Sequence, residues 1–108
     1  MTTKRAKTVR QTASSYLATL MRGPLTLGGA LSALRESDEM SLSEFAKLLE
    51  ISRSHLCDIE HGRRAVSPER AARFALALNQ QEAQFVRLAL QDQIREAGLK
   101  LKVEVHAA

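Results

Sequence analysis

Three serines, Ser41, Ser52 and Ser67, each precede a short segment whose apolar residues recur every three or four positions. A serine hydroxyl at such a place accepts a hydrogen bond from a free backbone amide and so begins a helix. Glu44 completes a capping box with Ser41, and Pro68 has the fixed φ that suits a first helical position. Ser41 and Ser52 are so close in sequence that two short helices must be joined by only a few residues. These signals therefore predict a bundle of short helices.

The apolar periodicity continues on both sides of these segments. We predict helices over residues 12–21, 27–37, 42–49, 53–61, 68–78 and 81–97. Gly62 lies where a left-handed residue ends the fourth of these helices, and Gly98 ends the last. In two of the helices the side chains expected to face the core are Phe45, Leu48 and Leu49, and Ala71, Ala72, Ala75, Leu76 and Leu78.

After Gly98 the apolar period changes from about 3.6 to 2, which is typical of a strand. Its apolar residues are Leu99, Leu101, Val103 and Val105. A lone strand leaves its backbone groups unpaired, so we expect it to pair with another chain, either a second copy or a different protein. Antiparallel self-pairing about Val103 sets Lys102 against Glu104, whereas pairing about Lys102 opposes two lysines. The first register is favoured.

The charge and composition limit the classes of protein and of partner that we expect for this chain. The net charge is +4, and residues 1–24 contain five basic side chains and no acidic one, which favours a polyanionic partner. Cys57 is the only cysteine, and no His/Cys spacing resembles a metal site. We find no glycine-rich phosphate loop or catalytic grouping, so we expect neither an enzyme nor a cofactor. No apolar run is long enough for a membrane span, so we expect a cytoplasmic protein.

The stretch from Ser43 to Arg64 contains a group of residues at fixed offsets: Phe45-Ala46, Ile51-Ser52, Leu56, Ile59-Glu60 and Gly62, followed by Ser67-Pro68. At these positions residues 31–79 resemble the Xre/Cro/C1 repressor family. The resemblance implies an all-α, lambda-repressor-like bundle of five to six helices with a helix-turn-helix, to which we add the C-terminal strand. It also implies operator DNA as the partner, read by the helix over 53–61.

The resemblance places the base-reading residues at Arg53, Ser54 and Asp58. Arginine can bind guanine bidentately, and an aspartate helps only where it meets a cytosine, because it otherwise faces a polyanion. It also implies a structural ion pair between Glu60 and Arg35. The expected phosphate contacts are Ser41, His55, Arg63 and Arg64. Arg70 and Arg73 are either a solvated helix face or a further DNA contact.

We therefore divide the chain into three segments. These are a basic arm with a short helix over residues 1–24, a DNA-binding domain over 25–98, and a tail over 99–108 for dimerisation or partner binding. The arm either contacts DNA in a neighbouring groove or is a solvated tail. The arrangement also resembles HigA/HipB-like antitoxins, which inhibit a toxin and repress their own operon. We favour this reading over a stand-alone homodimeric repressor of the same family.

Overall fold

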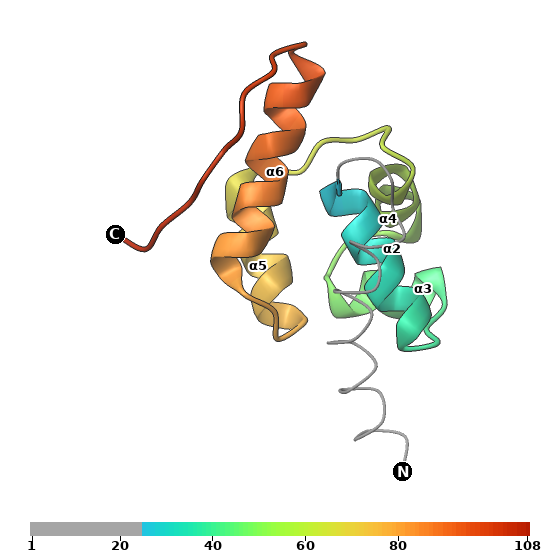
Figure 1. The fold of residues 1–108 in the computed structure, drawn as a ribbon. Helices are drawn as coiled ribbons and strands as arrows, with labels where there is room; N and C mark the ends of the chain where they lie inside the picture. Colours follow the sequence, from blue (N-terminus) through green and yellow to red (C-terminus); the bar gives the residue numbers. More distant parts are fainter. Residues whose placement is uncertain (1–24) are drawn as a thin grey trace.

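The computed structural model describes residues 25–108. Within them lie five helices: α2 (Leu27–Ser37), α3 (Leu42–Leu48), α4 (Arg53–Glu60), α5 (Pro68–Ala77) and α6 (Glu82–Glu96). The all-helical fold is confirmed for these residues, and each helix begins and ends within about two residues of its predicted range (Figure 1). The helix predicted over residues 12–21 lies outside the described residues. None of the described helices has the length and hydropathy of a membrane span.

The predicted start signals act as expected. Ser41 and Glu44 form a reciprocal capping box, in which the Ser41 hydroxyl accepts from the Glu44 amide and the Glu44 carboxylate accepts from the Ser41 amide. The Ser52 hydroxyl accepts from the amide of His55, and the Ser67 hydroxyl from that of Arg70. Each cap satisfies a backbone amide that the helix leaves unpaired, so the short helices start at defined residues.

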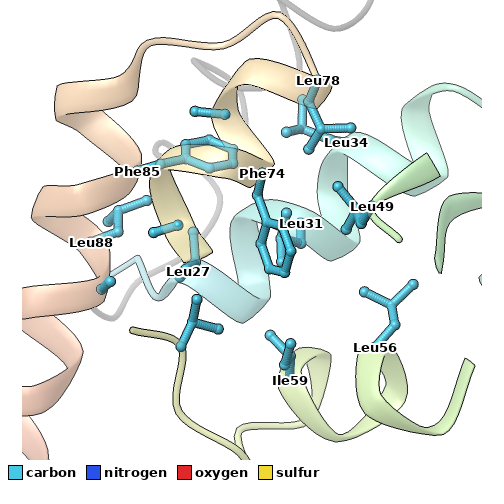
Figure 2. Close-up of a cluster of buried hydrophobic side chains, with 14 of the residues drawn as sticks. Leu27, Leu31, Leu34, Leu49, Leu56, Ile59, Phe74, Leu78, Phe85 and Leu88 are labelled. Carbon is cyan, nitrogen blue, oxygen red and sulfur yellow. The ribbon is translucent and has the colours of Figure 1, made fainter. Parts of the chain in front are cut away.

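All five described helices contribute side chains to one hydrophobic core, part of which is drawn in Figure 2. Its largest fully buried side chains are Phe45, Leu27, Leu31, Leu56 and Leu88. α5 and α6 are the pair of helices with the most extensive contact. Phe85 of α6 and Phe74 of α5 are both buried, and the Phe74 ring lies next to Leu31 of α2 (Figure 2). The aliphatic core fixes the position of α4, because both its buried side chains, Leu56 and Ile59, belong to this cluster.

Two leucines predicted to face the core are exposed. The side chain of Leu76 is 84% exposed, because Ala71, Phe74, Ala75 and Leu78 already form the i, i+3, i+4, i+7 face of that helix. Leu48 is 43% exposed, whereas its neighbour Leu49 is buried. Successive helical residues point about 100° apart, and in this helix Leu49 lies on the core side with Phe45, so Leu48 points toward solvent.

Residues 99–108 form neither a helix nor a strand within the described chain. This tail leaves the end of α6 and turns back beside it (Figure 1). The Gln91 side chain of α6 binds the tail at two points, the carbonyl of Leu101 and the amide of Val103. The predicted strand is therefore not formed inside one chain, and its pairing between chains stays a prediction.

Candidate nucleic-acid interface

Helices α3 and α4 are joined by a tight turn over residues 49–52. In this turn Glu50 adopts a left-handed backbone with φ of 60°, and the Ile51 amide donates to the carbonyl of Ala46 at 3.0 Å. Ala46 is only 2% exposed, and Ile51 packs against the core. The small, buried side chain of Ala46 allows the two helices to pack closely.

The inner side of α4 packs closely against α2. Gly28 of α2 lies against the backbone of Ile59 and Glu60, and a Cβ at that position would clash with the carbonyl oxygen of Ile59. The absence of a side chain at Gly28 therefore lets the two helices approach. Sequence reasoning missed this contact, because a glycine inside a helix does not show which backbone it faces.

Arg35 and Glu60 form a bidentate ion pair between the same two helices. Arg35 Nε donates to Glu60 Oε2 at 2.9 Å, and Arg35 Nη2 donates to Oε1 at 3.1 Å. The hydrogen bond from Glu60 raises the pKa of Arg35, against the opposing effect of burial. Arg35 Nη1 also donates to the carbonyl of Met40, so this one side chain joins α2, the α2–α3 turn and α4.

The outer side of α4 faces solvent. Arg53, its first residue, and Ser54 are exposed, and Cys57 and Asp58 one turn further are partly exposed. The predicted base-reading residues therefore lie together on the face opposite Leu56 and Ile59. A helix buried along one side and polar along the other is the arrangement that enters a major groove.

Asp58 binds Arg63, five residues further along the chain. Arg63 Nε donates to Asp58 Oδ1 at 3.0 Å, and Arg63 Nη2 lies 3.7 Å from the Cys57 sulfur. The hydrogen bond from Asp58 raises the pKa of Arg63. Arg63 therefore offsets the negative charge of Asp58 on the outer side of α4, and its guanidinium retains N–H groups at its Nη atoms.

His55 lies near two arginines, Arg64 and Arg70. Arg70 Nη1 of α5 is 3.1 Å from His55 Nε2. Burial lowers the pKa of His55, and the positive charges of Arg64 and Arg70 lower it further. A neutral imidazole can accept the Arg70 hydrogen bond. The contact with His55 shows that Arg70 is not merely a solvated residue of its helix face.

Ser41 lies at the start of α3, on the exposed surface. Its hydroxyl oxygen accepts from the Glu44 amide at 3.1 Å, which leaves the hydroxyl hydrogen to donate. A capping serine with a spare donor is suited to a phosphate oxygen near the helix N-terminus.

The comparisons with known proteins agree with this geometry. A family model described as a helix-turn-helix domain matches residues 26–88, which is more than half of the chain. The chain belongs to the helix-turn-helix domain family. The matched part contains α3, α4 and their turn whole and ends inside α6, before Gln91 and the tail. Helix-turn-helix domains bind DNA, with the second helix of the motif in the major groove. No curated protein and no solved structure matches the chain.

Proposed function

We propose that this protein is a sequence-specific, DNA-binding transcriptional regulator that reads the major groove with the outer face of α4. The observation that carries the proposal is the contrast between the two sides of this helix. Its inner side is held by Leu56, Ile59 and the ion pair of Glu60, while Arg53 and Ser54 are exposed at its N-terminal end. A rigid helix with exposed donors at its start meets the geometric needs of base readout.

Arg53 reads a guanine through its two-pronged guanidinium, and Ser54 contacts an adjacent base edge or phosphate. Asp58 acts through Arg63, because its carboxylate already accepts the Arg63 Nε–H. This assignment revises the direct reading of a cytosine by Asp58. Arg63 then provides the contact to a DNA acceptor, which is either guanine or phosphate.

Phosphate contacts flank this face. The donors for these contacts are Arg64, the spare hydroxyl hydrogen of Ser41 at the start of α3, and the His55–Arg70 pair. These groups position the protein without reading sequence. Their removal weakens binding to every DNA sequence to a similar extent.

The functional unit is a homodimer on a near-palindromic operator, with half-sites about one helical turn apart. We assign dimerisation to α6 and to the tail. Leu99 and Leu101 support this assignment, because they are 50% and 60% exposed and would be covered in a dimer.

We further propose that this regulator is the antitoxin of a type II toxin–antitoxin pair and represses its own operon. The resemblance of the motif, α6 and the tail to HigA/HipB-like antitoxins supports it. The test is to express the neighbouring gene alone and together with this chain. Growth arrest that this chain relieves supports the antitoxin role. A neighbouring gene without toxicity leaves the stand-alone repressor.

DNA binding itself is tested without knowing the operator. The protein is used to select duplexes from a random-sequence pool, and the enriched motif is compared with the DNA upstream of its own gene. We expect a two-fold symmetric motif that also occurs upstream, and repression of a reporter placed behind it. Recovery of no motif above the input pool would contradict the proposal.

A further inference from the structure

The tail is held by one side chain that binds it on both sides of Lys102. Gln91 Nε2 donates to the carbonyl of Leu101 at 2.8 Å, and the amide of Val103 donates to Gln91 Oε1 at 2.8 Å. The primary amide of Gln91 thus forms the two hydrogen bonds that a neighbouring strand would form. The tail is therefore held in an extended form before any partner arrives.

The two bonds also decide which edge of the tail remains available. In an extended chain the N–H and C=O groups of alternate residues point to opposite edges. Gln91 occupies the edge formed by the odd-numbered residues, of which Leu101 and Val103 are bound. The opposite edge is formed by Lys100, Lys102 and Glu104, all of them exposed.

We propose that this even-numbered edge pairs antiparallel with the same edge of a second copy of the chain, about a two-fold axis at Val103. The inference rests on the dimer of the proposed function and deepens it, because it names the edge, the register and the residue that prepares them. Gln91 is a positioning residue in this arrangement, since it acts on the partner only through the tail.

Charge and shape favour a second copy as the occupant. In this register each Lys102 lies opposite Glu104 of the other copy in a hydrogen-bonded pair, which joins opposite charges. Leu101, which is exposed, lies opposite Val105, which is partly exposed, so the two apolar side chains contact each other on one face. The two Val103 residues meet on the axis in a non-hydrogen-bonded pair, where the side chains are closest. An unrelated partner would need to supply both the charge and the apolar pattern.

Disulfide trapping tests the register directly. In a background with Cys57→Ser, the variant Val103→Cys is oxidised with diamide and its covalent dimer is followed on a non-reducing gel. A non-hydrogen-bonded pair sets the two Cα atoms about 4.5 Å apart, within the range of a disulfide. We expect Val103→Cys to cross-link at least about tenfold faster than Leu76→Cys, an exposed cysteine outside the tail that reports random collisions.

Two further variants distinguish the registers. Lys102→Cys alone is expected to cross-link slowly, because two copies lie diagonally, whereas a mixture of Lys102→Cys and Glu104→Cys chains links the unlike chains. Faster self-linking of Lys102→Cys than of Val103→Cys would overturn the register. Cross-linking of Val103→Cys at the rate of Leu76→Cys would overturn the pairing itself.

The role of Gln91 is tested in the same assay. Gln91→Met keeps the length of the side chain but removes both hydrogen bonds, and we expect the Val103→Cys cross-linking rate to fall about tenfold. Gln93→Met, an exposed change on the same helix, is the matched control and is expected to leave the rate unchanged. An unchanged cross-linking rate in Gln91→Met would show that Gln91 does not position the tail for pairing.

Each variant is also tested for binding to the DNA motif selected above. This measurement distinguishes a failure of the tail pairing from a failure of the proposed DNA-binding function. Symmetric DNA binding without cross-linking leaves the proposed function in place and refutes the tail pairing. Cross-linking without any DNA preference supports the tail pairing as a dimer contact and refutes the DNA-binding function.

Discussion

The two sides of α4 each contain one ion pair, and the pairs have nearly the same length. Arg35 Nε lies 2.9 Å from Glu60, and Arg63 Nε lies 3.0 Å from Asp58. Their surroundings differ. The side chains of the first pair are 17% and 4% exposed, whereas those of the second are 57% and 41% exposed. Similar geometry therefore serves two purposes: the inner pair fixes the helix, and the outer pair remains available to a ligand.

The largest effect is expected when the inner pair is broken. Glu60→Ala leaves the guanidinium of Arg35 largely buried without its carboxylate, which we expect to lower the free energy of unfolding by about 3 kcal/mol. Urea unfolding followed by circular dichroism measures the change. Asp58→Ala is the matched control on the outer side, with an unchanged unfolding midpoint. Equal losses in the two variants would show that the two sides do not differ.

A smaller loss is expected where α2 touches α4. Gly28→Ala introduces a methyl group against the carbonyl of Ile59, so the helices must shift apart, at a cost of about 2 kcal/mol. The same unfolding experiment measures it. A loss below about 0.5 kcal/mol, the usual range for surface substitutions, would mean that the close contact does not hold α4 in place.

The outer pair is expected to matter for DNA and not for folding. If Asp58 positions Arg63, then Asp58→Ala and Arg63→Ala each weaken binding to the selected motif, and the double variant is no weaker than Arg63→Ala alone. A double-mutant cycle measured by fluorescence anisotropy gives the coupling. Additive losses would indicate independent contacts and would restore Asp58 as a direct reader of bases.

The smallest effect is a pH dependence at His55. Its pKa is lowered in the folded state by burial and by Arg64 and Arg70, against the opposing charge of Asp58. The unfolded chain therefore takes up a proton first as the pH falls. The contribution of neutral His55 to the free energy of unfolding is fully present above about pH 6.5, and it is lost as the pH falls through the pKa of His55 in the folded state. Unfolding at pH 7.5 and 5.5 should show a smaller decrease in His55→Gln than in the wild type. An equal decrease in both proteins would contradict the assignment.

The sequence predicted the structural features that depend on residues close together in the chain. The serine caps, the left-handed Gly62 with φ of 74° and the helix boundaries follow from neighbouring residues. The family resemblance added the pairing of Arg35 with Glu60, a contact between helices that no local rule indicates. Leu76 shows where prediction from apolar periodicity fails. Leucine is apolar at every position, but only residues on one face of the helix reach the core, and Leu76 lies outside that face.

Other contacts between elements could not be predicted from the sequence. The bonds from Gln91 to the tail and from the Leu27 amide to Asp92 join a side chain to a backbone group that is 10, 12 or 65 residues away, and no sequence pattern indicates such a pairing. The Asp58–Arg63 pair crosses the end of α4 at a spacing of five residues, outside the i, i+3 and i, i+4 rules for helix pairs. Apart from the Arg35–Glu60 pair, the partners that these side chains have in the structure could therefore not be predicted from the sequence.

The central claim is that the exposed start of α4 reads DNA sequence. The most direct test is binding to the selected motif and to random duplex across a salt series, with wild type, Arg53→Ala and Arg64→Ala. We predict that Arg53→Ala reduces the preference for the motif about tenfold or more, while Arg64→Ala weakens both duplexes alike and lowers the salt dependence. A preference that survives in Arg53→Ala at every salt concentration would contradict the account.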